Sequence, residues 1–102
     1  MQVVLTTCPI NEAEKLRESL LKEKLAACAL IIPMKESKFL WEGKIDCAEE
    51  SLLVFKTQKK LAGKLFQRIK DIHPYDIPFI AEVDVKKVNE SYERWLNKVL
   101  AK

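Results

Sequence analysis

The sequence predicts an α+β fold in which strands and helices follow the order βαββαβ, with one more helix at the C-terminus. Two observations support this prediction. Apolar residues recur at helical spacing in three segments, and short β-branched or aromatic runs bounded by turn residues separate those segments. Two βαβ-like halves of this kind form the split sheet of a ferredoxin-like fold. The chain has 102 residues, 48% of them hydrophobic, which favours one domain over residues 1–102.

The first half of this pattern is a strand, a helix and a second strand. The β-branched run over residues 2–7 predicts a buried strand. Asn11 is a favourable N-cap with Glu14 three residues later, so a capping box would open a helix over about residues 12–23. The apolar run over residues 26–32 predicts a central strand.

A hairpin is predicted next. Residues 38–45 form two strand-like runs beside Gly43, and a Gly-X pair can supply a type II′ turn. Residues 51–57 extend the second arm as a long strand. The tip carries Phe39 and Trp41, which a monomer of this size would struggle to cover. Exposed edges are usually paired with another chain, so the hairpin predicts self-association.

The second half repeats the helix and strand pattern. An amphipathic helix is expected over residues 59–72, and His73-Pro74 ends it. Apolar and acidic residues alternate within residues 79–85, which predicts a half-exposed strand. Asn89 would cap the final helix. The apolar side of that helix consists of Tyr92, Trp95, Leu96 and Val99.

Composition excludes several classes of protein. The net charge of +3 comes from 18 basic and 15 acidic residues, so the surface is mixed and is no nucleic-acid footprint. No apolar run approaches the length of a membrane span, and no secretory segment opens the chain, so membrane insertion is not expected. The three cysteines, Cys8, Cys28 and Cys47, form neither a C-x-x-C pair nor a zinc spacing. A reducing, cytoplasmic setting fits this usage.

The segment His73-Pro74-Tyr75-Asp76-Ile77-Pro78 is the most informative motif. Its two prolines restrict the backbone at both ends, and it holds the only histidine of the chain. An imidazole, a phenol and a carboxylate therefore stand close together on a stiff connection. The structural alternative is that His73 only ends the preceding helix.

The residues favour metal binding over catalysis or RNA binding. Neither the predicted first strand nor the predicted third strand offers the platform of aromatic residues on which RNA bases stack. Cys8 and His73 are the only Cys/His pair, but no glycine-rich phosphate loop accompanies them, so an enzyme is not expected. Thiolate and imidazole together suit copper or zinc. Such a site would need further ligands from carboxylates or a second subunit, and no organic cofactor is expected.

Several segments together resemble the CutA family of divalent-cation tolerance proteins, in order and spacing from Gln2 to Leu100. The matching segments are Thr6-Thr7-Cys8-Pro9, Lys24-Leu25-Ala26-Ala27-Cys28, Ile32-Pro33, Trp41-Glu42-Gly43-Lys44-Ile45, Lys56-Thr57, His73-Pro74-Tyr75-Asp76-Ile77-Pro78, Tyr92 and Trp95-Leu96. The resemblance implies a ferredoxin-like protomer in a tight homotrimer whose hairpins pair between subunits, as in the PII signalling proteins. It also implies tolerance to divalent metals, notably copper, without an enzymatic activity.

The resemblance also suggests site residues. His73 occupies the family's His-Pro-Tyr position and is the first metal-ligand candidate. Cys8 is the second candidate, although the family's copper-binding cysteine corresponds to Thr6, two residues earlier. Cu²⁺ or another divalent cation would be the metal.

A different class of function uses the same predicted architecture. A PII-like trimer could sense a small molecule in a cleft between subunits, with Trp41, Lys56 and Tyr75 at that cleft or interface. A third hypothesis is a non-enzymatic scaffold that acts through protein partners.

Overall fold

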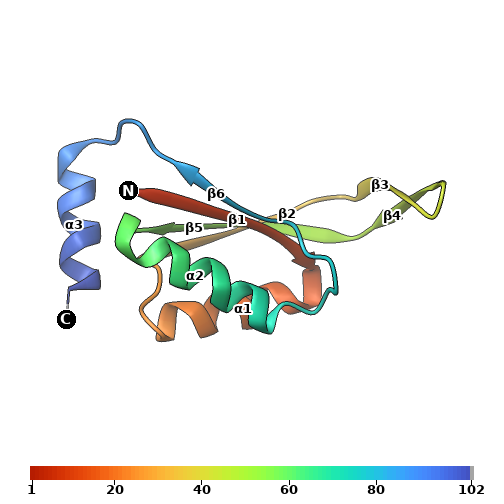
Figure 1. Ribbon diagram of the computed structural model, residues 1–102, viewed down its shortest axis with the longest axis horizontal. Coiled ribbons are helices and arrows are strands. Elements are labelled where there is room, and N and C mark those ends of the chain that lie inside the picture. The colour runs from red at the N-terminus through yellow and green to blue at the C-terminus, as the bar shows by residue number, and fades with distance from the viewer. Residues whose placement is uncertain (102) are drawn as a thin grey trace.

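A computed structural model describes residues 1–101 and has the predicted ferredoxin-like α+β architecture (Figure 1). Four strands form an antiparallel sheet in the order β2-β5-β1-β6, and β3 and β4 form a two-stranded ribbon. The elements are β1 (Gln2–Pro9), α1 (Ile10–Lys22), β2 (Cys28–Pro33), β3 (Ser37–Trp41), β4 (Lys44–Ala48), β5 (Glu50–Thr57), α2 (Lys59–Ile72), β6 (Ile80–Asp84) and α3 (Glu90–Leu100).

Helices α1 and α2 cover one face of the sheet, and the core lies between them and the strands (Figure 1). Alternate residues of β1 and β5, such as Val4 and Phe55, point into this core and are fully buried. Leu20 of α1 and Ile69 of α2 meet them from the helix side. The helical spacing of apolar residues is therefore what fixes each helix on the sheet.

The opposite face of the sheet, which we call the open face, carries apolar residues that no helix covers. One cross-strand row on this face runs through Leu30, Val54, Leu5 and Ala81. Helix α3 stands at the end of the sheet instead of lying over this face (Figure 1). Leu30 is accordingly 41% exposed.

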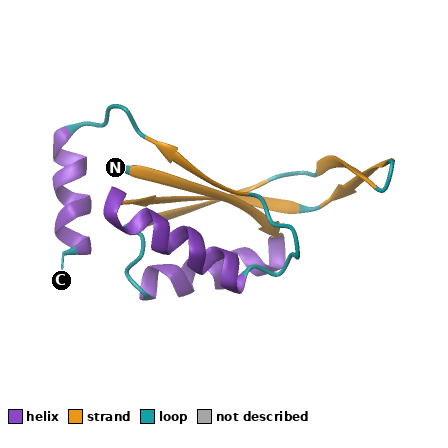
Figure 2. Ribbon diagram, in the orientation of Figure 1, coloured by secondary structure: helices purple, strands orange, loops and turns teal. Residues whose placement is uncertain are grey.

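The hairpin β3–β4 projects beyond the rest of the molecule (Figure 2). Its first arm reaches back through β2, and its second arm continues through β5, because β2 and β5 pair with each other. The long paired arms expected from the sequence are present, but the first begins at Cys28. Leu40 and Ile45 face each other across the ribbon and are 79% and 76% exposed.

Three local predictions were wrong. Helix α1 begins at Ile10 directly after Pro9, whose φ of −56° and ψ of 143° suit the N-cap position, so Asn11 lies inside the helix and caps nothing. The turn residues Glu42 and Gly43 have φ values of +50° and +77°. Two positive values define a type I′ turn, not type II′.

The third error concerns β2. It was expected to be a central strand, but it lies at the sheet edge, where it pairs with β5 alone. Cys28 is consequently only partly buried, since the edge position leaves one side of β2 open.

Other local predictions were confirmed. Helix α2 spans the expected residues and ends at His73, whose extended backbone cannot continue the helix. The alternation of β6 places Ala81 and Val83 on one face, which is the open face of the sheet. Asn89 is the N-cap of α3, although its side chain makes no capping hydrogen bond.

Candidate functional site

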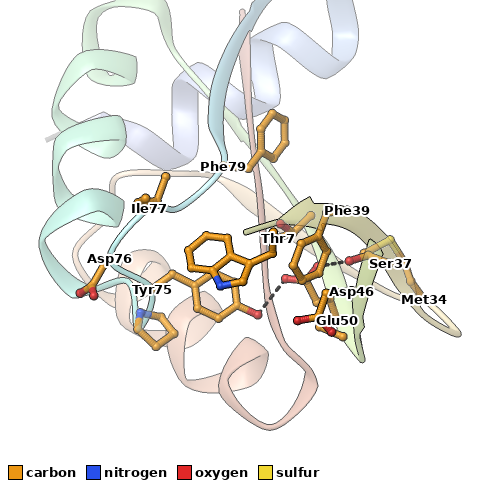
Figure 3. Close-up of a pocket in the computed structure, with 13 residues that line it drawn as sticks. Thr7, Met34, Ser37, Phe39, Asp46, Glu50, Tyr75, Asp76, Ile77 and Phe79 are labelled. Carbon is orange, nitrogen blue, oxygen red and sulfur yellow. Dashed lines mark hydrogen bonds between the residues drawn. The ribbon is translucent and has the colours of Figure 1, made fainter. Parts of the chain in front are cut away.

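A pocket of about 800 Å³ opens beside the base of the hairpin, where β1 ends and β5 begins (Figure 3). Its walls come from β1, from the hairpin, from the start of β5 and from the His73–Phe79 connection. The lining residues are Thr7, Met34, Ser37, Phe39, Trp41, Asp46, Ala48, Glu50, Pro74, Tyr75, Asp76, Ile77 and Phe79. Apolar and aromatic side chains dominate this lining, which is typical of a small-molecule site.

Glu50 is the buried polar group of this pocket. Its side chain accepts hydrogen bonds from Ser37 Oγ at 2.5 Å and from Tyr75 Oη at 2.8 Å (Figure 3). Its backbone carbonyl accepts a hydrogen bond from the N–H of Met34 at 2.9 Å. Glu50 thus ties the hairpin and the proline-rich connection to the start of β5.

His73 holds the proline-rich connection against β1. Its Nδ1 accepts a hydrogen bond from the N–H of Tyr75 at 3.1 Å, so its Nε2 carries the proton. That Nε2–H donates to the carbonyl of Thr7 at 2.9 Å. Both ring nitrogens are therefore engaged, and a metal ion at His73 would have to displace one hydrogen bond.

Cys8 lies next to Thr7 on β1, but its side chain points into the core and is fully buried. Burial, followed by the negative charges of Glu50 and Glu12, raises the pKa of the Cys8 thiol from 9.0 to about 11. The thiol is consequently protonated at neutral pH. Cys8 lies within β1, which continues to Pro9.

Tyr75 contacts both His73 and Glu50. Its ring lies 5.1 Å from the His73 ring, measured between centroids. Burial, together with the hydrogen bond to Glu50, raises the pKa of the Tyr75 phenol from 10.0 to about 12. The Tyr75 hydroxyl therefore keeps its proton, and remains a hydrogen-bond donor, at neutral and moderately alkaline pH.

Trp41, Lys56 and Tyr75 were predicted to lie at a cleft or interface between subunits, and within one chain only two of them lie together, so that grouping stays a prediction. Trp41 and Tyr75 line the pocket. Lys56 lies at the other end of β5, where its Nζ donates to Tyr92 Oη at 3.3 Å and stands 5.0 Å from the centre of the Tyr92 ring. Lys56 therefore orients α3 and makes no contact with this pocket.

No preformed metal cluster accompanies these residues. Within residues 1–101, no group of three or more His, Cys, Asp and Glu side chains is arranged to hold a metal ion. Nor is any helix of that stretch long and apolar enough to cross a membrane.

Sequence reasoning missed Glu50 as a site residue. The residue stands in phase with Leu52 and Val54, so its side chain could have been assigned to the open face. Nothing local indicated that Ser37 and Tyr75 would converge on it, because they lie 13 and 25 residues away.

Comparison with known proteins gives one consistent result. A family model described as "CutA1 divalent ion tolerance protein" matches residues 2–99. The chain is 46% identical over 99 residues to a protein of Pyrococcus horikoshii named "Divalent-cation tolerance protein CutA", with 94% of each chain covered. It is also 42% identical over 95 residues to "Protein CutA 1, chloroplastic" of Oryza sativa subsp. japonica, covering 92% of this chain and 54% of that protein.

A solved structure agrees with the sequence comparisons. The crystal structure of the divalent ion tolerance protein CutA1 from Ehrlichia chaffeensis superposes with a TM-score of 0.94 at 32% sequence identity. The superposition covers 99% of this chain and 95% of that one.

Proposed function

The chain belongs to the CutA1 divalent ion tolerance family, and we propose that it acts as a homotrimer that binds or responds to copper and other divalent metals. We further propose that residues 1–102 act as one domain in the cytoplasm, without catalysing a reaction. The metal role is proposed because its relatives are named for tolerance to divalent cations. The observation that best supports an assembly is the uncovered apolar surface of the hairpin and the open face.

The exposed residues favour self-association for a physical reason. Leu40 and Ile45 form a cross-strand pair that is almost fully in water, and Trp41 beside them is half exposed. Burying such side chains contributes about 25 cal/mol per Å² of apolar surface. The ribbon also leaves backbone groups at its outer edges free to pair with another strand. The number three comes from the family resemblance.

The assembly is tested by light scattering on the purified chain. We expect a mass of three chains for the native protein. Leu40→Lys should shift the mass toward one chain, because it places a charge in the proposed contact. Leu40→Met, which keeps an apolar side chain of similar size, should retain the native mass. A monomeric native protein, or a Leu40→Lys variant with the native mass, would contradict the proposal.

The proposed metal contacts are His73 and Cys8. They lie at the same end of β1, since His73 bonds to the carbonyl of Thr7, the neighbour of Cys8. Coordination would require His73 to give up a hydrogen bond and Cys8 to lose a proton despite its raised pKa. We therefore expect modest affinity and a further ligand from a carboxylate or a second subunit.

Calorimetry on the reduced protein tests this assignment. The titration uses a Cys47→Ser background, because the exposed Cys47 thiol could bind metal on its own. We expect saturable Cu²⁺ binding that His73→Ala abolishes. Unchanged Cu²⁺ affinity in His73→Ala would remove His73 from the site.

The pocket beside Glu50 favours a second candidate function, a PII-like sensor of a small molecule. Its volume lies within the range of ordinary ligand pockets, and its walls come from segments far apart in the sequence. A thermal-shift screen separates the two candidates. Stabilisation by metals alone favours the first, and stabilisation by organic compounds alone favours the second.

A further inference from the structure

We propose that the pocket beside Glu50 binds a small organic cation, namely an ammonium group attached to an apolar or aromatic body. This inference deepens the second candidate function, because it names the chemical class that such a sensor would detect. It rests on three features of the pocket. These are a buried carboxylate without a counterion, aromatic walls, and a lining whose charged side chains are all acidic.

The carboxylate of Glu50 carries the first argument. The residue is only 7% exposed, yet both of its side-chain oxygens are bonded to hydroxyl groups alone. Among residues 1–101, no lysine, arginine or histidine forms a salt bridge with it. Buried charges are normally paired, so this carboxylate lacks its usual counterion.

Glu50 also has bonding capacity left for a ligand. A carboxylate offers about four acceptor positions, and the side chains of Ser37 and Tyr75 occupy two of them. An ammonium group has two or three N–H donors that could use the remainder. Such a charge-assisted bond is about twice as strong as a neutral one.

The walls of the pocket suit the rest of such a molecule. Phe39, Trp41, Tyr75 and Phe79 supply aromatic side chains from the hairpin and from the connection after α2. Aromatic faces attract cations within about 6 Å and also bury apolar groups. A ligand with a cationic head and an apolar body would therefore use both properties of the lining.

The remaining charges of the lining have one sign. Asp46 and Asp76 add two carboxylates to Glu50, and no lysine or arginine of the described part of the chain lines the pocket. Nucleotides and other anions would meet repulsion here without a basic group to bind them. A bare metal ion lacks a preformed set of three ligands among residues 1–101.

Three compounds with the same phenylpropyl carbon skeleton but different charges test the inference on the native assembly. We expect 3-phenylpropylamine, which is protonated at neutral pH, to bind by calorimetry. The neutral 3-phenylpropanol should bind at least about tenfold more weakly, because it loses the charge-assisted bond to Glu50. The anion 3-phenylpropionate should not bind detectably. Equal or tighter binding of the anion would overturn the proposal.

Two matched variants locate the contact. Glu50→Gln removes the charge but keeps one acceptor oxygen, and its NH2 group can donate to the other hydroxyl once that hydroxyl rotates, so it should lower the affinity for the amine at least about tenfold. Glu49→Gln removes the same charge from the exposed neighbouring position and should leave that affinity within about twofold. An unchanged affinity in Glu50→Gln would overturn the assignment.

A third variant keeps the test valid if Glu50→Gln fails to fold. Phe79→Leu leaves an apolar wall but removes an aromatic face outside the hairpin, so the amine should lose more affinity than the alcohol. Equal losses for the two compounds would contradict a cationic ligand. Light scattering and circular dichroism on each variant check that it has the native mass and fold before its affinity is compared.

The experiment distinguishes two errors, namely a ligand that is not an organic cation and a protein that does not sense a small molecule at all. Binding of a nucleotide or another anion to the pocket, without binding of amines, would overturn the class and leave the sensor function standing. Absence of binding by all organic compounds to a correctly assembled trimer would overturn both.

Discussion

At the scale of single residues, the proline-rich connection is held by side chains whose polar atoms are already engaged. The two ring nitrogens of His73 bond to the carbonyl of Thr7 and to the N–H of Tyr75. The hydroxyl of Tyr75 in turn donates a hydrogen bond to the side chain of Glu50. Each of these side chains has a partner for its polar atoms, which is the condition for burying such groups at low cost. Removing the His73 side chain would take these hydrogen-bond partners from the carbonyl of Thr7 and from the N–H of Tyr75.

The buried thiol of Cys8 should make the protein sensitive to alkali. An unfolded thiol loses its proton near pH 9.0, whereas the folded one keeps it until about pH 11. The unfolded state is therefore increasingly favoured as the pH rises through this interval, by a free energy on the order of 2–3 kcal/mol. Urea unfolding at several pH values between 8 and 11 measures the loss.

Cys8→Ala is the control for this effect. It should lower the free energy of unfolding at every pH through the cavity that it creates, but it should flatten the decline above pH 9. Tyr75, whose pKa is also raised, leaves part of the decline in place. A variant with an undiminished slope would show that Cys8 is not responsible.

The sequence predicted contacts of the candidate site correctly where the contacting residues are close together along the chain. His73 and Tyr75 were singled out because they stand on either side of Pro74 in a connection that prolines restrict, and they do contact each other. Lys56 lies at the opposite end of β5 within one chain, where it bonds to Tyr92, so its grouping with Tyr75 at a cleft between subunits stays a prediction. Glu50 was missed because its partners are distant in sequence.

At the scale of elements, the prediction from the sequence agrees with the structure where the residues that determine an element lie within that element. The bounds of α2 were predicted correctly, because apolar spacing and a terminating His-Pro are both visible within the segment. The edge position of β2 was not, because the order of strands follows from long-range pairing. The apolar sequence of β2 suggested a central strand, but its exposed residues belong to the open face.

The two glycines provide a matched pair of substitutions. Gly43 has a φ of +77°, and a Cβ atom added there would meet no other atom, so Gly43→Ala should cost about 1 kcal/mol through backbone strain alone. Gly63 lies on the exposed side of α2 with equally open space, so Gly63→Ala should stabilise by about 0.5–1 kcal/mol.

Urea unfolding measures both effects in one series. Opposite signs for the two alanine substitutions would agree with the type I′ turn. A neutral or stabilising Gly43→Ala would show that the turn does not have this backbone conformation in solution.

At the scale of the whole molecule, the sheet has helices on one face only. The helix face contains the core, whereas the open face presents Leu30, Val83 and their neighbours to solvent. An apolar sheet face is normally covered by a second layer. The proposed assembly would supply that layer from other copies of the chain.

A charge placed on the open face should therefore weaken assembly. We expect Leu30→Glu to lower the mass measured by light scattering at micromolar concentration. Ile10→Glu is the matched control, because Ile10 is similarly exposed at 45% but begins α1, away from the open face. Equal behaviour of the two variants would argue that the open face is not the contact.

The one-sided sheet has a further consequence for how this protein is kept folded. If copies of the chain complete one another's second layer, dilution removes part of the driving force for folding. The midpoint of thermal unfolding would then rise with protein concentration, and no single free energy would describe the chain alone. The rate at which a cell synthesises the protein would thereby become one of the determinants of its structure.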